Sequence, residues 1–371
     1  MRILHLIDHM GLGGAQNLVL DLVETRSSKI DVAVWTLSEQ VLSSAAKRLE
    51  SADVPIRTLG LSKFNPLGLL RLRTFLRKEN PDLLHTHLQF SSIFGIAAAL
   101  SLGKHCPRLV NHVHNDPLLH YTPWQRAGIR LLAPFIDVQI TSSSSLRKKV
   151  MHFLGNRARR IEAVTPGINL KRFEQGNMEP KHMDHFRGDA ALVVGTAARL
   201  TRQKALHVLL EATPALLAAE PSTRVLIAGD GPLRHSLERQ AARLKISHAV
   251  AFLGYQSDMA PVYRAMDVLV LPSEHEGFGI ALIEAMALKI PVVATRVVGI
   301  VDAVEDGVTG LLVPYGDAGA LSSAILRVWE RTQLKRELIH NASLFVLCKC
   351  SREFMTARIE SVYFGLGKRK N

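Results

Sequence analysis

The sequence predicts an α/β protein built from two doubly wound parallel sheets, and two observations lead to this prediction. Short apolar runs that suit buried strands alternate with segments of helical composition along the chain. The pattern begins again near residue 191, so the second half repeats the plan of the first. A chain of 371 residues is long enough for about two domains with full cores.

The first half opens with a predicted buried strand at residues 1–8, whose apolar core is too short for a signal peptide. Further strands are expected at residues 31–35, 82–85 and 108–113. Residues 176–182 are polar and contain glycine and proline, which is typical of a linker. We therefore expect a first domain over residues 1–180.

The second domain is expected over residues 181–345, with strands at 191–195, 224–229 and 249–254. Next, residues 267–272 form an apolar run stopped by proline, residues 280–288 have helical composition, and residues 291–295 suit another strand. The loop between this first strand and the helix is expected at the carboxyl edge of the parallel sheet, where such folds bind ligands.

That loop and helix carry a candidate binding site. The backbone amides of Phe278, Gly279 and Ile280 at the helix start would attract an anion such as a diphosphate. Glu276 precedes them and Glu284 follows about a turn and a half later, so both could accept hydrogen bonds from the hydroxyls of a nucleotide sugar. The alternative is that both are ordinary acids, Glu276 near a helix start and Glu284 on an exposed helix face.

Composition excludes several classes. No apolar run approaches the roughly 20 residues of a membrane-spanning helix, and 47% hydrophobic residues indicate a folded chain. Three cysteines are too few for a disulfide framework, and Cys348 and Cys350 have no second cysteine pair for a zinc site. We therefore expect a cytoplasmic, reduced protein.

Six motifs in order resemble glycosyltransferase family 4, whose GT-B plan has two Rossmann-like doubly wound domains facing each other across a cleft. The last one, from Glu276 to Glu284, matches the E-x7-E motif of the family. The six motifs lie at residues 11–16, 113–116, 166–173, 198–204, 229–232 and 276–284.

The resemblance implies roles for particular residues. The loop of Gly13 and Gly14 would close over donor and acceptor, and Gly231 would lie in the wall of the nucleotide pocket. Glu284 would bind the ribose hydroxyls and Glu276 the sugar hydroxyls. The cations assigned to the leaving diphosphate are Arg199 and Lys204.

The sequence departs from the family in one place near these cations. The family usually has glycine after the lysine, where this chain has Ala205. We expect the change to have little effect, since alanine also begins a helix well.

Histidine occurs 16 times, so most histidines are expected to be structural or solvated. By resemblance His114 is the catalytic-loop histidine, with a positioning and electrostatic role. His112 is its main rival on the same strand, and we interpret His85 and His87 as structural. A zinc site built from these histidines is conceivable. The acids and cysteines expected around one are absent, however, and the resemblance to GT-B enzymes implies that catalysis needs no metal, so no metal site is predicted.

The implied activity is transfer of a sugar from a nucleotide-diphosphate sugar to an acceptor hydroxyl, with the anomeric configuration retained. No covalent nucleophile and no cofactor are expected, and the acceptor would be a lipid-linked or cell-surface glycan, as in polysaccharide biosynthesis. In similar enzymes the final helix, here within residues 346–371, crosses back to the first domain. Its apolar residues at 355, 359, 362 and 363 keep helical spacing.

The charge of the chain is uneven. Residues 1–180 hold 23 lysines and arginines against 14 acids, a net +9 of the total +13. A basic stretch at residues 69–78 has the composition of an interfacial helix on anionic lipid, or of a solvated basic face. The first interpretation would place the protein peripherally on the inner face of the cell membrane.

Three other functions are compatible with parts of the sequence. A sugar-nucleotide epimerase could share the two-domain plan, but would need different catalytic acids. A basic nucleic-acid-binding protein would explain the positive charge, yet the aromatic content is 6% and no stacking motif is visible, so no nucleic-acid partner is expected. The third is a catalytically silent sugar-binding or scaffold protein, against which the intact candidate site residues argue.

Overall fold

The computed structural model describes residues 1–11, 13–61, 66–174 and 186–367, and its chain divides into two compact units. One contains Met1–Gly167 together with Arg352–Asn371, and the other contains Ile168–Ser351. The boundary that the sequence suggested at residue 180, and most of the linker suggested there, lie outside the described residues. The second expected boundary, residue 345, falls inside a helix of the second unit.

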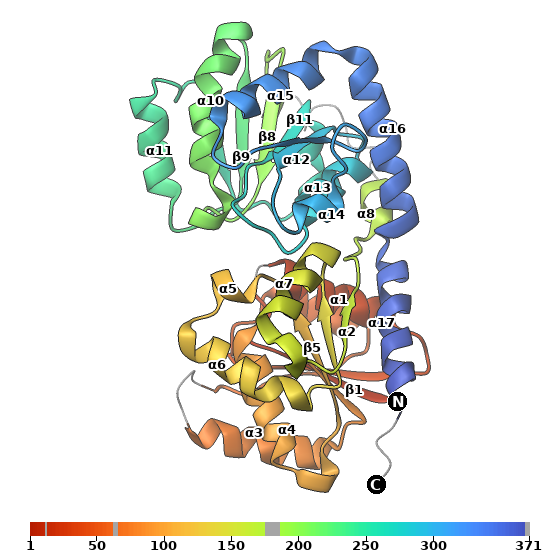
Figure 1. The fold of residues 1–371 in the computed structure, drawn as a ribbon. Coiled ribbons are helices and arrows are strands. Elements are labelled where there is room, and N and C mark those ends of the chain that lie inside the picture. Colours follow the sequence, from red (N-terminus) through yellow and green to blue (C-terminus); the bar gives the residue numbers. More distant parts are fainter. Residues whose placement is uncertain (12, 62–65, 175–185, 368–371) are drawn as a thin grey trace. The chain divides into compact units, whose positions relative to one another are not determined.

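The first unit is built on a parallel sheet whose strands, in the described part of the chain, follow the order β3-β2-β1-β4-β5-β6-β7 (Figure 1). The strands are β1 (Arg2–Ile7), β2 (Asp31–Thr36), β3 (Ile56–Thr58), β4 (Leu83–His87), β5 (Arg108–Val113), β6 (Val138–Thr141) and β7 (Ile161–Ala163). The fourth strand runs two residues further than the sequence indicated, so His87 belongs to it.

Helices cover both faces of this sheet because apolar residues alternate between the faces of its strands. Ile3 and Ile7 of β1 belong to one buried cluster, and Leu4 and Leu6 belong to the other. The helices are α1 (Gly14–Thr25), α2 (Ser43–Ser51), α3 (Pro66–Glu79), α4 (Ile96–Leu100), α5 (Pro117–His120), α6 (Pro123–Leu132), α7 (Ser144–Leu154) and α17 (Arg352–Leu366).

The second unit repeats the plan with a parallel sheet of order β10-β9-β8-β11-β12-β13 in its described residues. Its strands are β8 (Val193–Ala197), β9 (Arg224–Ala228), β10 (Val250–Gly254), β11 (Val268–Leu271), β12 (Val292–Thr295) and β13 (Leu311–Val313). Its helices are α8 (Leu170–Glu174), α10 (Leu206–Ala219), α11 (Arg234–Arg243), α12 (Ala260–Arg264), α13 (Ile280–Ala287), α14 (Ile300–Ala303), α15 (Ala318–Glu330) and α16 (Thr332–Lys349). The predicted class, two doubly wound α/β sheets, is confirmed.

The strand order reverses once in each sheet, between β1 and β4 in the first unit and between β8 and β11 in the second. Loops leaving the carboxyl ends of those two strands diverge to opposite faces, and the space between them is where doubly wound sheets bind ligands. Most candidate residues follow β1, β8 or β11. His114 follows β5, the neighbour of β4, and Gly231 follows β9, the neighbour of β8.

The interfacial-helix interpretation of residues 69–78 does not fit α3. Leu72 and Leu76 are both 0% exposed and pack into the core, and Phe75 contacts Trp35 edge to face at 5.8 Å between ring centroids. The apolar side of α3 therefore covers the sheet, and its basic residues form a solvated face. No helix in the described part of the chain is both long and apolar enough to cross a membrane.

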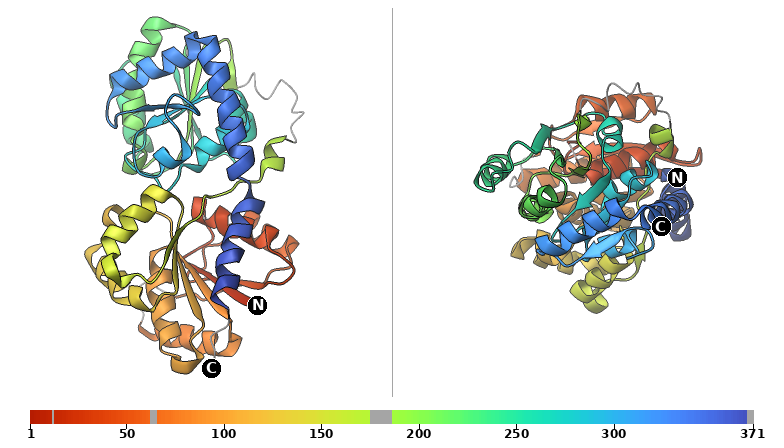
Figure 2. Two further views of the ribbon diagram at one scale, coloured as in Figure 1. Left: turned by 45° about the vertical axis from the view of Figure 1, so that its right-hand side comes forward. Right: turned by 90° about the horizontal axis from the view of Figure 1, so that it is seen from above.

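The last helix, α17, packs on the first unit next to α1 (Figures 1 and 2). The four apolar residues with helical spacing, Met355, Ile359, Val362 and Tyr363, are all buried in the same cluster as β1. Polar contacts support the packing, because the Ser27 amide donates to Glu360 Oε1 at 2.7 Å. Burial of four such side chains stabilises the first unit by several kcal/mol, at about 1.5–3 kcal/mol each as an upper estimate.

A chain that ends at Ser351 is expected to unfold at a lower temperature and to be less soluble, because it exposes the apolar surface that α17 covers. Thermal unfolding followed by circular dichroism, together with the soluble fraction after centrifugation, measures both effects. A chain that lacks only residues 368–371 is the control and should behave as the full chain. An unchanged unfolding temperature for the chain ending at Ser351 would contradict the packing.

Candidate active site

Two loops of the second unit bring a lysine and an acid together. Lys204 follows β8, Glu276 follows β11, and Lys204 Nζ donates to Glu276 Oε1 at 2.5 Å. Ser273 Oγ donates to the same oxygen at 2.7 Å. Glu276 is only 6% exposed, so its charge requires these partners. The pair joins two of the residues that the sequence selected, at the edge where the strand order reverses.

Backbone contacts hold the two loops to each other. The Glu274 amide donates to the Gln203 carbonyl at 2.8 Å. In the other direction, Gln203 Nε2 donates to the His275 carbonyl at 2.9 Å. These hydrogen bonds fix the distance between the two loops. The contact between Lys204 and Glu276 therefore rests on a rigid backbone and not only on two flexible side chains.

Ala205 corrects one expectation from the sequence. It is the N-cap of α10 and lies in the left-handed region, with φ 48° and ψ 37°, which glycine adopts more readily than alanine. The conformation costs about 1–2 kcal/mol, offset in part by about 0.8 kcal/mol from burial of the methyl group. The expected tolerance of alanine as a helix starter overlooked this backbone conformation.

Gly231 has a clear packing role. A Cβ atom at this position would lie 2.7 Å from both the amide nitrogen and the carbonyl oxygen of Leu200. The loop after β9 therefore approaches the backbone after β8 more closely than any side chain would allow. Gly231 thereby shapes the surroundings of Arg199, which is exposed just before Leu200.

The start of α13 provides backbone amides. Gly279 is the N-cap with φ 90°, a left-handed conformation that favours glycine. The Phe278 side chain is buried in the core at 4% exposure, so only its backbone is suited to contact a ligand. The first amides of a helix have no carbonyl partner inside the helix, and Ile280 is the first residue of this one. These groups can bind an anion, as the sequence suggested.

Glu284 of α13 is held by a residue that the sequence did not single out. Tyr263 of α12 is 0% exposed, and its hydroxyl donates to Glu284 Oε2 at 2.6 Å. Burial, and then the negative charge of Glu284, raise the pKa of Tyr263 well above its ordinary value, so the phenol remains a proton donor. Glu284 itself is partly exposed and can receive a ligand.

In the first unit, Gly13 and Gly14 lie at the start of α1, just after the carboxyl end of β1. Gly13 is the N-cap, and a Cβ atom there would meet Gln16 Oε1 at 2.3 Å. Gly14 is the exposed first residue of the helix. The missing side chain of Gly13 therefore makes room for Gln16, and Gly14 leaves the exposed first residue of the helix without a side chain.

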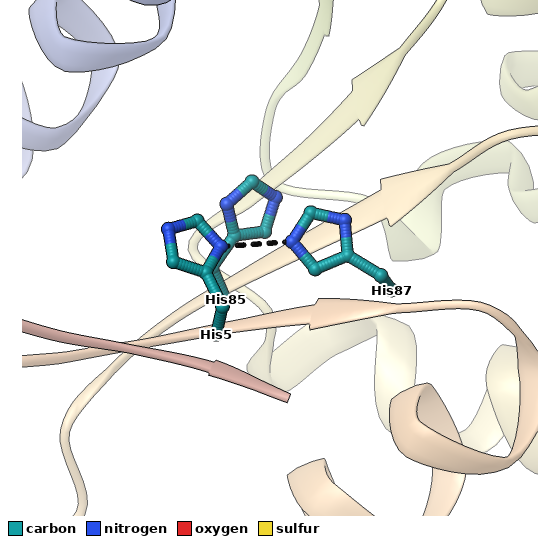
Figure 3. Close-up of side chains that lie close together, drawn as sticks. All are labelled: His5, His85 and His87. Atoms are coloured by element: carbon teal, nitrogen blue, oxygen red, sulfur yellow. Dashed lines mark hydrogen bonds between the residues drawn. The ribbon is translucent and has the colours of Figure 1, made fainter. Parts of the chain in front are cut away.

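His114 does not stand alone, because five histidines gather on and just after three neighbouring strands. His5 lies on β1, His85 and His87 on β4 (Figure 3), and His112 on β5, with His114 just beyond. His114 Nε2 lies 3.3 Å from His87 Nδ1, and its ring stacks on that of His112 at 4.3 Å between centroids.

Burial is the main cause of lowered pKa values throughout this cluster. It lowers the pKa of His5 to about 4 and that of His114 to about 3. The pKa values of His85, His87 and His112 are also lowered, by burial first and then by the neighbouring histidines. The rings are therefore neutral at neutral pH.

The structure thus joins Lys204 to Glu276, places Glu284 and the amides of residues 278–280 on one helix, and gathers His114 with other histidines of the first unit. Sequence reasoning missed Ser273, Tyr263 and His5. Ser273 was visible as a polar residue just after a buried strand. Tyr263 carried no local signal, since its partner is 21 positions away. His5 could have been noticed as a polar residue at an apolar position of a buried strand.

Two doubly wound units that gather charged residues and glycines near the switch points of their sheets are typical of proteins that bind nucleotide ligands. Comparison with known protein families identifies the family to which this chain belongs. Residues 12–172 match the family described as "Glycosyltransferase Family 4", and residues 191–331 match "Glycosyl transferases group 1". The chain belongs to the glycosyltransferases of family 4 and is a glycosyltransferase.

Individual relatives agree. A D-inositol 3-phosphate glycosyltransferase of Saccharomonospora viridis is 30% identical over 332 residues, 84% of this chain and 76% of the relative. The capsular polysaccharide biosynthesis glycosyltransferase CapM of Staphylococcus aureus is 25% identical, over 87% of this chain and 88% of the relative. The epimerase, nucleic-acid-binding and silent-scaffold alternatives gain no support from these similarities.

Solved structures share the fold. HepE of Anabaena, solved with UDP and glucose, has a TM-score of 0.86 and 23% identity, over 98% of this chain and all of that one. A sucrose-phosphate synthase from Thermosynechococcus elongatus has a TM-score of 0.83 and 22% identity, over 99% of both chains. These similarities establish the GT-B fold.

Replacement of Tyr263 by phenylalanine is expected to weaken binding of a nucleoside diphosphate about fivefold, roughly 1 kcal/mol, because Glu284 loses a fixed hydrogen bond. Calorimetry of the variant measures the change. In a Glu284→Ala background the same replacement should have almost no further effect, since the contact is already lost. Equal losses in both backgrounds would show that Tyr263 acts through general packing.

Proposed function

We propose that this glycosyltransferase moves a sugar from a nucleotide-diphosphate sugar to an acceptor hydroxyl and retains the anomeric configuration. The observation that carries the proposal is the contact of Lys204 with Glu276 beside the start of α13. A cation, a carboxylate and helix-start amides match the three parts of the donor's reacting end: the diphosphate charge, the sugar hydroxyls and the phosphate oxygens. The UDP and UDP-glucose bound to HepE support a donor of this type.

In this proposal the donor rearranges the ion pair. The diphosphate takes over Lys204, and Glu276, still held by Ser273, is left to accept hydrogen bonds from the sugar. Arg199, from the same loop as Lys204, adds a second cation. Together with the amides of α13 they stabilise the negative charge that develops on the leaving diphosphate.

The rest of the mechanism needs no covalent intermediate. The acceptor hydroxyl attacks from the same face as the departing diphosphate, and a phosphate oxygen takes its proton. His114, with its lowered pKa, is neutral and serves as a positioning group. Because the protein supplies cations and amides for the leaving group, we propose that no divalent metal is needed on the diphosphate, and no other cofactor takes part.

The acceptor is proposed to be a lipid-linked or cell-surface glycan. CapM, which aligns over most of both chains, is described as a capsular polysaccharide biosynthesis enzyme. An acceptor carried on lipid would draw this basic protein to an anionic membrane surface. Sedimentation with anionic vesicles tests that contact, and a protein that stays in the supernatant at low salt would exclude it.

The proposed activity is tested by mass spectrometry of products from a panel of nucleotide sugars, with membrane extract as acceptor and EDTA present throughout. The expected product is one glycan whose new linkage has the anomeric configuration of the donor, assigned by nuclear magnetic resonance. A product of inverted configuration would refute retention. Activity that appears only after Mg²⁺ or Mn²⁺ is added in excess of EDTA would refute the metal-free leaving group.

Replacement of Glu284 by alanine is expected to weaken binding of the nucleoside diphosphate by about 1–3 kcal/mol, because the ribose hydroxyls lose their acceptor. Calorimetry with the diphosphate of the preferred donor measures the loss. Glu330→Ala, which changes an exposed acid at the end of α15, is the matched control. Unchanged affinity in the Glu284 variant would exclude it from the ribose site.

A further inference from the structure

Three histidines of the first unit converge in its core. His5 projects from β1, and His85 and His87 project from β4 on the same side of the sheet (Figure 3). Parallel pairing places His5 opposite His85, and strand alternation puts His87 on the same face. One ring nitrogen of each lies within 4.8 Å of those of the other two, and all three side chains are buried.

Hydrogen bonding within the protein does not satisfy this cluster. His5 Nδ1 and His87 Nε2 lie 3.0 Å apart and share one proton. His85 Nε2, however, is buried with no partner among the described residues, and so are both ring nitrogens of His112 beside it. A buried polar atom left unpaired costs about 1–3 kcal/mol, and three occur here together. A group that accepts nitrogen lone pairs would remove part of this cost.

Two of the three outer nitrogens, those of His85 and His87, have the partners expected around metal ligands. His85 Nδ1 lies 2.5 Å from the Tyr363 hydroxyl, and His87 Nδ1 lies 3.3 Å from His114 Nε2. Metal-bound histidines usually engage their second nitrogen in this way, which fixes the tautomer and aims the first nitrogen at the ion. The cluster thus has both the converging nitrogens and the supporting contacts.

We propose that His5 Nδ1, His85 Nε2 and His87 Nε2 bind one late first-row transition-metal ion, with Zn²⁺ as the probe. Imidazole nitrogen suits zinc, copper and nickel, whereas magnesium and calcium prefer oxygen. Two nitrogens on one tetrahedral zinc ion lie about 3.3 Å apart, close to the 3.0 Å between His5 and His87. Three protein ligands leave a fourth position for a solvent hydroxide, which lowers the charge buried with the ion.

The ion would act at a distance from the sugar-transfer chemistry. With Nε2 of His87 on the ion, Nδ1 carries the proton and donates to His114 Nε2, which fixes the tautomer of His114. The contact of His85 with Tyr363 would likewise tie α17 to the bound ion. The proposal rests on these histidines alone and does not depend on the donor, the acceptor or the stereochemistry of transfer.

The test uses the full chain, stripped with a chelator and then titrated with Zn²⁺. Metal analysis after gel filtration should find one tightly held ion per chain, and Co²⁺ in its place should give the visible absorption of a tetrahedral site. His5→Leu should weaken Zn²⁺ binding at least 100-fold, whereas His114→Leu, which removes only an outer partner, should still bind one ion.

Tyr363→Phe keeps all three ligands but removes the partner of His85, so it should weaken Zn²⁺ binding roughly 10- to 100-fold. This variant tests the zinc site if His5→Leu does not fold. No tightly held ion in the full chain would overturn the proposal. Binding that survives His5→Leu but is lost in His114→Leu would also overturn it, by placing the ion among His87, His112 and His114, which likewise approach one another.

Discussion

Parallel pairing of the strands is the constraint on which the rest of this structure depends. Parallel neighbours require a crossover helix between them, so every strand ends at the same edge of its sheet and every following loop begins there. One reversal of the strand order then separates two of those loops. The chemistry of both units follows from that geometry, because residues far apart in the chain are delivered to one short edge.

At the edge of the second unit, backbone contacts determine what the side chains can do. The loops after β8 and β11 exchange hydrogen bonds, and the loop after β9 touches the first of them through Gly231. A rigid frame of this kind holds a cation against a buried carboxylate before any ligand arrives. The backbone contacts fix where both side chains begin, so a ligand that separates the pair has to move side chains and not the loops.

The first unit shows the opposite arrangement, in which polar side chains occupy the core. Histidines stand on three adjacent strands where apolar residues would pack at no electrostatic cost. Their neutral state follows from burial, and their contacts lead from β1 through His87 to His114. A polar core of this kind restricts each ring to a few orientations, which apolar packing alone would not do.

The sequence by itself determined most of the strands, helix α13 and the last helix with its buried apolar stripe, because these depend on the local order of apolar residues. It also placed Glu276 on the loop after β11 and Glu284 on the helix that follows, and the family resemblance suggested the roles proposed for them. What it could not decide was which distant residues meet. The partnership of Tyr263 with Glu284, the meeting of His5 with His87, and the side of α3 that faces inward were all decided by strand order and register. The left-handed backbone conformation of Ala205 likewise depends on how the loop after β8 joins α10. Local composition carries no information about pairing across the sheet, and only the tertiary structure supplied it.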